Sequence, residues 1–300
     1  MKKIISIFLF MGLLVAQTRH MPADTTVVTK HKTTIRGKKV DYRATTGTQP
    51  VWNEDGNPIA AVHYTYYERT DIKKNPSRPI MISFNGGPGS GSVWMHLAYT
   101  GPMILNVDDE GFPVQPYGVK SNPFSILDVA DIVFVNPVNT GYSRILDKET
   151  KKETFFGVNA DIAYLAEWIN TFIQRVNRWE SPKYLIGESY GTTRVSGLAS
   201  ALQGRQWMYI NGVILVSPTE LGIDVGSGRR SGPLGAALRV PYFTAAAWYH
   251  NKLPRDLQRK DLLEVLKESE DYAVNKLISV IAKGGFVDER ERKKAAATMS

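Results

Sequence analysis

One pentapeptide, Gly-Glu-Ser-Tyr-Gly at positions 187–191, limits the possible folds of this chain more than any other segment. It follows a short apolar run at 183–186 and precedes a segment with the composition of a helix. A serine between a buried strand and a helix lies on a sharp turn with a strained backbone, and the flanking glycines let strand and helix approach closely. Such a turn exposes the Ser189 hydroxyl where the next amide and the helix N-terminus can stabilise a negative charge. The pattern predicts a nucleophilic serine; the alternative is a turn of small residues that serves packing alone.

The rest of the chain predicts an α/β fold. Short apolar runs that stop at glycine or at Asn-Pro are expected to be buried strands, and Asn159 is the expected N-cap of a helix with apolar residues at helical spacing. Before them, β-rich sequence around a turn cluster predicts antiparallel strands. The expected strands lie in 33–67, 80–84, 132–135, 183–186 and 210–216, and the expected helices in 159–176, 191–203, 242–250, 261–268 and 289–299. We therefore expect a mostly parallel, doubly wound sheet followed by a helical segment.

A second glycine-rich segment, Asn85–Ser92, directly follows the expected strand at 80–84. It does not fit a phosphate-binding loop, because no Gly-Lys-Ser/Thr follows and a Gly-x-Gly-x-x-Gly pattern begun at Gly87 ends on Ser92. Glycines allow backbone amides to approach a nucleophile because no Cβ blocks the way. Together, the two glycine-bearing segments predict an oxyanion hole beside the serine.

These two segments and three others stand in the order seen in the serine carboxypeptidase family of α/β-hydrolases, which the chain resembles from about residue 78 to 249. The motifs are Asn85–Ser90, Gly101-Pro102, Asn122–Ser125, Asn136–Ser143 and Gly187–Gly191. The resemblance implies an α/β-hydrolase-type sheet, the start of that family's helical cap after about residue 219, and a hydrolase that releases C-terminal residues from peptides through an acyl-enzyme. We expect no cofactor, and no His-Glu-x-x-His metal pattern is present.

The resemblance implies roles for six residues: Ser189 as nucleophile, the amides of Gly87 and Tyr190 as oxyanion hole, and Asn85, Gly86 and Glu188 as ligands for the terminal carboxylate of a peptide. Glu188 also has a physical interpretation of its own. A carboxylate beside the nucleophile repels a substrate carboxylate unless one of them is protonated and they share a hydrogen bond, so binding should weaken as the pH rises. The alternative is that Glu188 bonds only to nearby backbone.

Two departures from the family pattern concern carboxylate binding. Many relatives carry a tryptophan two residues before the asparagine and an acidic residue two before the Gly-Pro, where this chain has Ser83 and Tyr99. Two of the expected carboxylate-binding groups are therefore missing, so an esterase or an acyltransferase on the same scaffold is a second hypothesis. A non-catalytic binding module with a hydrolase fold is a third, and it applies if the chain ends at Ser300.

The largest departure from the family pattern is that the sequence offers no clear acid and base for a Ser-Asp-His triad. In this fold both follow the serine along the chain. The only histidine after Ser189 is His250, in a helix-like run, and Asp224 could pair with it formally. The favoured interpretation is that these 300 residues are the first part of a longer hydrolase, so that the catalytic Asp, the catalytic His and the last strands follow residue 300. The earlier histidines are expected to be surface or packing residues: His20, His31, His63 and His96.

The first residues have the pattern of a secretory signal, because Lys2 and Lys3 precede an apolar run at 4–15 that ends in small or polar residues. We expect residues 1–17 to be cleaved, 18–220 to form the hydrolase core and 221–300 an incomplete cap, in a soluble protein that is periplasmic or secreted. The formal charge of +8 is modest and the basic residues are scattered, which argues against nucleic-acid binding. The absence of cysteine excludes disulfides and thiolate metal sites. Peptides are the expected partners.

Overall fold

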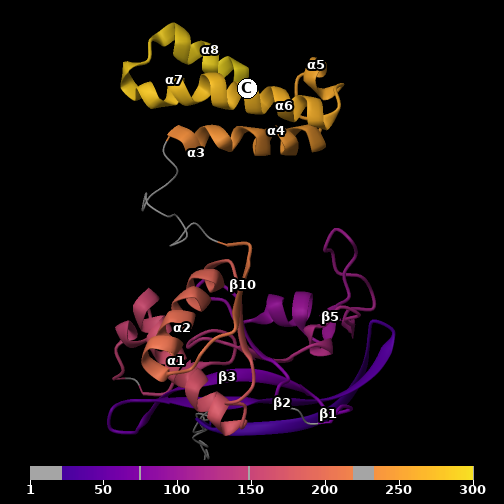
Figure 1. Ribbon diagram of the computed structural model, residues 1–300, viewed down its shortest axis with the longest axis vertical. Helices are drawn as coiled ribbons and strands as arrows, with labels where there is room; N and C mark the ends of the chain where they lie inside the picture. The colour runs from indigo at the N-terminus through magenta and orange to yellow at the C-terminus, as the bar shows by residue number, and fades with distance from the viewer. Residues whose placement is uncertain (1–21, 74–75, 148, 219–232, 300) are drawn as a thin grey trace, which may run out of the picture. The chain divides into compact units, whose positions relative to one another are not determined.

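The structure, a computed structural model, describes residues 22–73, 76–147, 149–218 and 233–299 (Figure 1). The chain divides into two compact units between Thr219 and Glu220. The predicted signal at 1–17 and Asp224 lie outside the described residues. Among the described helices, none is both long and apolar enough to cross a membrane. The extents of the predicted hydrolase core and cap stay predictions.

The first unit is built on one mixed sheet with the strand order β1-β2-β3-β7-β4-β9-β10 (Figure 1). Strands β7, β4, β9 and β10 are parallel, and β1, β2 and β3 form antiparallel pairs. The strands are β1 (Thr25–Ile35), β2 (Lys38–Trp52), β3 (Pro58–Arg69), β4 (Ile80–Phe84), β7 (Asp131–Val135), β9 (Lys183–Glu188) and β10 (Gly212–Val216), with the short β8 (Arg144–Ile145) paired to β3. The α/β class and the mostly parallel sheet predicted from the sequence are confirmed.

Alternate residues of the central strands serve the two faces of the sheet. In β4, Ile82 and Phe84 join the large core cluster that includes residues of α1 and α2, whereas Met81 joins a smaller cluster with Met95 of η1. The helices of this unit are η1 (Met95–Thr100), η2 (Ile126–Asp128), η3 (Lys152–Thr154), α1 (Val158–Arg175) and α2 (Tyr190–Gln206). The helices α1 and α2 therefore cover one face of the sheet, and the π-helix η1 covers part of the other.

Helix α1 docks through one apolar face. Leu165, Ile169 and Phe172 recur at helical spacing and are almost completely buried. The ring of Phe172 stacks on Trp168 with the centroids 5.3 Å apart. The Trp168 indole nitrogen donates to the carbonyl of Gln49 in β2 at 3.3 Å. This contact fixes α1 on the antiparallel half of the sheet.

The predicted N-cap at Asn159 is wrong. Helix α1 begins at Val158, and Gly157 takes the N-cap position with a φ of +113°. Glycine adopts that conformation without the steric cost that other residues pay. Asn159 lies in the first turn instead. Sequence reasoning favoured Asn159 because asparagine is a commoner N-cap residue than glycine, and a positive φ leaves no mark in composition.

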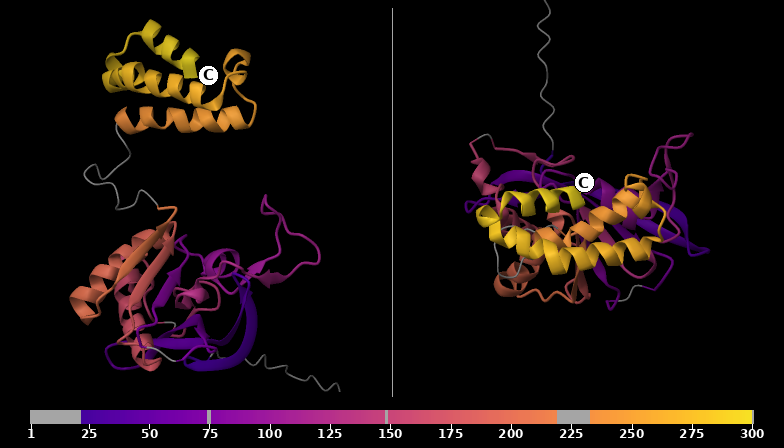
Figure 2. Two further views of the ribbon diagram at one scale, coloured as in Figure 1. Left: turned by 45° about the vertical axis from the view of Figure 1, so that its right-hand side comes forward. Right: turned by 90° about the horizontal axis from the view of Figure 1, so that it is seen from above.

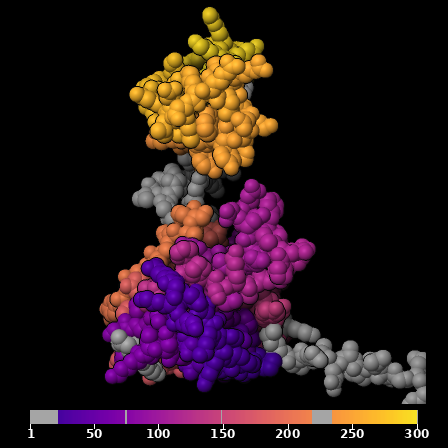
Figure 3. Space-filling view, turned by 90° about the vertical axis from the view of Figure 1, so that its right-hand side faces the viewer, coloured from indigo at the N-terminus to yellow at the C-terminus, as the bar shows by residue number. Residues whose placement is uncertain are grey.

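A two-stranded hairpin projects from the body of the first unit (Figures 2 and 3). Its strands are β5 (Met103–Leu105) and β6 (Val119–Ser121), which pair antiparallel. The segment between them carries Phe112 and Tyr117, which are both largely exposed. The hairpin is therefore a surface arm that adds little to the core.

The second unit is helical, and no strand occurs in its described part, 233–299 (Figure 2). Its helices are α3 (Pro233–Leu238), α4 (Val240–Tyr249), α5 (Arg255–Gln258), α6 (Leu262–Tyr272), η4 (Ala273–Leu277), α7 (Ile278–Lys283), η5 (Gly284–Phe286) and α8 (Glu289–Met299). Ala237, Ala273 and Leu277 form its main buried cluster, so the helices approach through small side chains. The predicted helical character is confirmed for this range, and the role of the unit as a cap stays a prediction.

Candidate active site

Ser189 lies at the turn between β9 and α2, at the carboxyl ends of the parallel strands. Its φ of +55° and ψ of −125° fall outside the regions that L-residues favour, so the turn stores backbone strain. Three hydrogen bonds hold it: the Ser189 amide donates to the carbonyl of Val216 at 3.0 Å, and the amide and the hydroxyl of Thr192 donate to the Ser189 carbonyl at 2.9 and 2.7 Å. The strained turn predicted from the pentapeptide is present, and the role of Ser189 as nucleophile stays a prediction.

Close packing requires both glycines of the pentapeptide. A Cβ on Gly187 would lie 2.1 Å from the carbonyl oxygen of Gly191, and a Cβ on Gly191 would lie 3.0 Å from the carbonyl oxygen of Phe84. Both contacts are with backbone, which cannot move aside as the end of a flexible side chain can. The glycines therefore let β9, α2 and the end of β4 meet at the serine, as the sequence pattern predicts.

The second glycine-rich segment lies directly against the serine. A Cβ on Gly86 would lie 2.6 Å from the Tyr190 nitrogen and 2.8 Å from the Ser189 Cβ. Gly87 has a φ of +109°, and the Gly86 carbonyl accepts from the Ser90 amide at 3.3 Å. Because the C=O and N–H of a trans peptide point in opposite directions, this bond turns the Gly87 N–H away from Ser90. The structure thus brings together the two segments predicted to form the oxyanion hole.

Asn85 and Glu188 are in direct contact, although 103 residues separate them in the sequence. Nδ2 of Asn85 donates to Oε2 of Glu188 at 2.9 Å. The Asn85 side chain is buried, and its Oδ1 accepts from the Met95 amide at 3.0 Å, which fixes the orientation of the side-chain amide. Glu188 is partly exposed. The structure therefore gives Glu188 a side-chain partner rather than nearby backbone alone, and carboxylate binding by this pair stays a prediction.

A buried ion pair behind the serine turn is absent from the sequence-based predictions. Nε of Arg194 in α2 donates to Oδ2 of Asp161 in α1 at 2.7 Å, and Arg194 is 1% exposed. Both charges stand in apolar stripes: Arg194 precedes Leu198 and Leu202 at intervals of four residues, and Asp161 precedes Leu165 in the same way. That spacing is the signal that could have found the pair, because a charge on the core side of a helix needs a buried partner.

The Asn136 side chain joins a third segment to the glycine-rich one. Its Oδ1 accepts from the Ser92 amide at 2.8 Å, and its Nδ2 donates to Nδ1 of His63 at 3.1 Å. Burial lowers the pKa of His63, which favours the neutral ring that can accept this bond. A Cβ on Gly141 would clash with the Asn136 amide. The motif at 136–143 therefore supports the glycine-rich segment from the side.

In the described part of the chain, no base lies at the serine. Within the described residues, no side chain forms a hydrogen bond with the Ser189 hydroxyl. His250 is exposed at the end of α4 in the second unit. Its formal partner, Asp224, lies outside the described residues. The Asp224–His250 pair and the catalytic Asp and His expected after residue 300 therefore remain sequence-based expectations.

His96 serves packing, as predicted. Its ring stacks on Phe134 with the centroids 4.4 Å apart, and its Nε2 forms a hydrogen bond with the Tyr67 hydroxyl at 2.6 Å. Burial lowers the pKa of His96 to about 4, so the ring is neutral at physiological pH. His31, by contrast, is an exposed surface residue on β1.

The two departures from the family pattern lie near the glycine-rich segment in the sequence. Ser83 is buried in β4, and its hydroxyl has no hydrogen-bond partner among the described residues. Tyr99 lies in η1 and is more than half exposed. Within the described part of the chain, neither side chain forms a hydrogen bond with Asn85 or Glu188. The carboxylate of Glu188 therefore depends on Asn85 for its side-chain hydrogen bond.

The chain is similar to known proteins over the region that contains this site. A family model described as serine carboxypeptidase matches residues 38–217. Serine carboxypeptidase-like 31 of Arabidopsis thaliana is 27% identical over 167 residues, covering 54% of this chain and 31% of that protein. Serine carboxypeptidase-like 37 of the same organism is 30% identical over 193 residues, covering 61% of this chain and 36% of that protein. The chain thus spans about a third of the length of these curated relatives.

Among solved structures, the chain is similar to Kex1(delta)p, a prohormone-processing carboxypeptidase from Saccharomyces cerevisiae. The two are 17% identical, with a TM-score of 0.49, over 87% of this chain and 52% of that chain.

Proposed function

Because the chain belongs to the serine carboxypeptidase family and has the α/β-hydrolase fold, we propose that it is an exported hydrolase that releases C-terminal residues from peptides. The observation that carries the proposal is the packing of Gly86 against Ser189 and Tyr190. It joins a strained serine to the backbone of a glycine segment, which is the arrangement that acyl transfer requires.

In the proposed reaction the Ser189 hydroxyl attacks the scissile carbonyl and a base accepts its proton. The amides of Gly87 and Tyr190 stabilise the negative oxygen that forms, and the N-terminus of α2 adds positive potential. The C-terminal amino acid then leaves with a proton on its nitrogen, and the acyl group remains on the serine. Water hydrolyses this ester and restores the hydroxyl. We propose that a histidine and an aspartate outside the described residues supply the base.

Release of the last residue requires recognition of a terminal carboxylate, which we assign to Asn85, Gly86 and Glu188. Glu188 can share a proton with the substrate carboxylate only while one of the two groups is protonated. The KM for a peptide with a free C-terminus should therefore rise as the pH rises. The variant Glu188→Gln cannot lose a proton, so its KM should vary less with pH. A Glu188→Gln profile that superimposes on the wild-type profile contradicts proton sharing.

A fluorophosphonate probe tests the nucleophile in the protein expressed from its complete gene. We expect mass spectrometry to find the label on Ser189 and no label on the Ser189→Ala variant. Wild-type protein that stays unlabelled contradicts the proposed chemistry and favours the non-catalytic module. Turnover of one peptide as free acid and as C-terminal amide then tests the specificity. Equal rates for the two forms contradict carboxypeptidase action.

An esterase or an acyltransferase on the same scaffold is the second candidate. The observation that favours it is the presence of Ser83 and Tyr99 where relatives carry groups of the carboxylate-binding network. Turnover of a simple ester without turnover of the peptide acid would assign the protein to this class. Labelling of Ser189 alone does not separate the two candidates, so both substrates belong in the same experiment.

Export is the part of the proposal that rests on the leader sequence at 1–17. N-terminal sequencing of the protein isolated from its own cells should find a start close to residue 18. A start at Met1 contradicts cleavage of a signal. The intact mass from the same preparation tests the expectation that the polypeptide continues past Ser300.

A further inference from the structure

Arg194 donates three hydrogen bonds to two segments of the first unit, α1 and the glycine-rich segment. Its Nε donates to Asp161 at 2.7 Å, its Nη1 to the carbonyl of Asn85 at 2.8 Å and its Nη2 to the carbonyl of Pro88 at 3.5 Å. Its guanidinium carbon lies 5.1 Å from the centroid of the Tyr190 ring. One cation on α2 is therefore linked to α1 and to the residues on either side of Gly86 and Gly87.

The two carbonyls flank Gly86 and Gly87. This dipeptide has no side chain with which to fix its own conformation, and glycine loses more backbone freedom on ordering than any other residue. Gly87 also has a φ of +109°. The bonds from Arg194 to the carbonyls of Asn85 and Pro88 supply a restraint that the two glycines cannot supply themselves.

Arg194 also contacts the residue that carries the other predicted oxyanion donor. Its Nε donates to the Asp161 carboxylate, and its guanidinium carbon lies over the ring of Tyr190, whose backbone amide is the second predicted donor. The side chains of Arg194 and Asp161 are 1% and 8% exposed, so water does not compete for these bonds. A single ion pair is thereby connected to the backbone around Gly87 and to the side chain of Tyr190.

We propose that Arg194, held by Asp161, is a positioning residue that sets the relative placement of the Gly87 and Tyr190 amides. This inference rests on the proposed function of Ser189. A buried ion pair adds little net stability because the cost of desolvation offsets the attraction, so a role in geometry accounts for its presence better than stability does. Lysine cannot replace the arginine, because one ammonium group lacks the planar fork that reaches a carboxylate and two carbonyls together.

Arg178 provides a matched control at the amino ends of the parallel strands. It pairs with Asp131 and donates to the carbonyls of Arg78 and Pro79 at 2.7 and 3.4 Å, and its side chain is 7% exposed. It resembles Arg194 in burial and in the kinds of partner it has, but its described partners are all outside the predicted site. Arg178→Lys should destabilise the fold much as Arg194→Lys does.

The test compares these two variants in the protein expressed from its complete gene, at a temperature where both are folded. The maximal rate constant for fluorophosphonate labelling of Ser189 and the half-saturating probe concentration are measured separately. We expect Arg194→Lys to lower the rate constant at least about tenfold and to leave the half-saturating concentration within about twofold. Arg178→Lys should change neither. Equal rate constants for the two variants overturn the proposal.

Hydrogen exchange distinguishes failure of this inference from failure of the proposed function. If the wild-type protein is not labelled, the proposed function fails. Hydrogen exchange at the amides of 86–92 then tests the positioning role of Arg194 by itself. These amides should exchange at least about tenfold faster in Arg194→Lys than in the wild type and in Arg178→Lys. Unchanged exchange overturns the proposal. If Arg194→Lys does not fold, Asp161→Asn and Asp131→Asn are compared by the same two measurements.

Discussion

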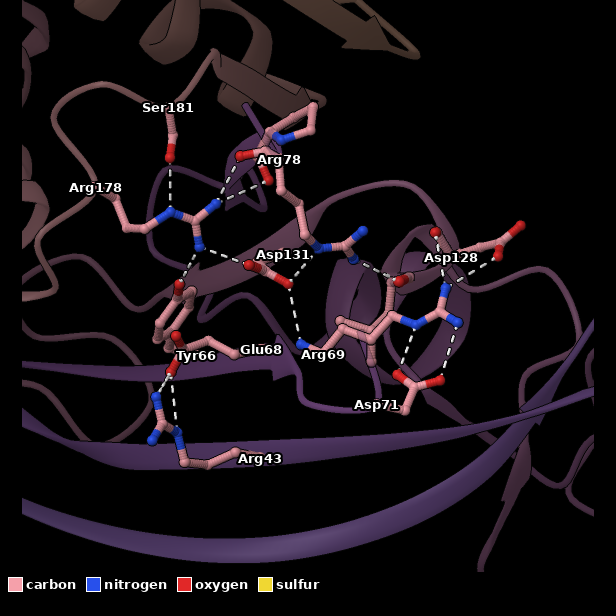
Figure 4. A network of polar contacts seen from close by, with 12 residues as sticks. Arg43, Tyr66, Glu68, Arg69, Asp71, Arg78, Asp128, Asp131, Arg178 and Ser181 are labelled. Carbon is pink, nitrogen blue, oxygen red and sulfur yellow. Dashed lines mark hydrogen bonds and ion pairs between the residues drawn. The ribbon is translucent and has the colours of Figure 1, made fainter. Parts of the chain in front are cut away.

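Two buried arginines lie at opposite ends of the parallel strands, and they have the same kinds of partner but different surroundings. Each pairs with an aspartate and donates to two backbone carbonyls. Arg178, at the amino ends, belongs to a wider network in which Asp131 also accepts from Nε of Arg78 and from the Arg69 amide (Figure 4). Arg194, at the carboxyl ends, is the only described cation that pairs with Asp161.

The backbone beside each arginine explains the difference. Arg178 holds the residues that lead into β4, whereas Arg194 holds a segment that contains Gly87 and lies against Ser189, both with positive φ. At the amino ends several donors share Asp131, whereas at the carboxyl ends Arg194 bonds to a segment that contains Gly87 with its positive φ. A cleft of about 690 Å³ lies at the amino ends, away from the predicted chemistry, so cavity size alone does not locate the site.

The largest expected loss of stability follows a substitution at the amino ends of the parallel strands. Arg178→Met leaves Asp131 buried with Arg78 as its remaining cation, so we expect a loss of about 3 kcal/mol in the free energy of unfolding. Urea denaturation measures this loss. Arg175→Met is the control, because Arg175 pairs with Asp24 at the surface and should cost less than about 1 kcal/mol. Equal losses in the two variants contradict a structural role for the buried network.

The carboxyl ends should respond in activity more than in stability. Gly86→Ala places a methyl group 2.6 Å from the Tyr190 nitrogen, so the segment must shift away from the serine. We expect the labelling rate at Ser189 to fall about 100-fold, which is about 2.7 kcal/mol in the barrier. Gly89→Ala is the matched control, because a Cβ there has open space. A similar fall in both variants points to general damage to the loop.

Lowering the pH should destabilise the first unit through His96. The pKa of His96 is about 4 in the folded protein and about 6.5 in an unfolded chain. The unfolded state therefore binds the proton first, so the contribution of His96 to stability is constant above pH 6.5 and falls as the pH drops from 6.5 to 4. We expect this loss to be about 2 kcal/mol, allowing for the partial exposure of the ring.

Unfolding free energies across that pH range check the acid prediction. His96→Gln removes the titration, so its stability should fall less steeply between pH 6.5 and 4 than that of the wild type. The buried arginines stay charged throughout this range and should add no slope of their own. Parallel curves for the wild type and His96→Gln contradict the assignment.

The smallest expected effect is a gain in the free energy of unfolding. Ser189→Gly removes the steric cost of a positive φ, so the free energy of unfolding should rise by about 1 kcal/mol while labelling is lost. Thermal denaturation measures the gain. Ser189→Ala keeps the Cβ and should show no such increase. A Ser189→Gly variant that is no more stable than Ser189→Ala argues that the turn is not strained.

The sequence predicted the elements that depend on residues close together in the chain. The run at 183–186 and the pentapeptide after it describe a strand, a strained turn and a helix, because each depends on neighbouring residues. The contact between Asn85 and Glu188 joins distant segments, and only the family resemblance suggested it. Gly157 and the ion pair of Arg194 with Asp161 were missed, because a positive φ and a buried charge pair are set by tertiary packing rather than by neighbours in the chain.

The burial of Trp168 against α1 and β2 has a practical consequence for spectroscopy. Trp168 is 2% exposed, whereas the other tryptophans described in the first unit are 37–75% exposed: Trp52, Trp94, Trp179 and Trp207. A shielded indole emits at shorter wavelength than a hydrated one and is quenched last by acrylamide. Among the tryptophans described in the first unit, the blue-shifted part of the fluorescence therefore reports whether α1 is docked on the sheet.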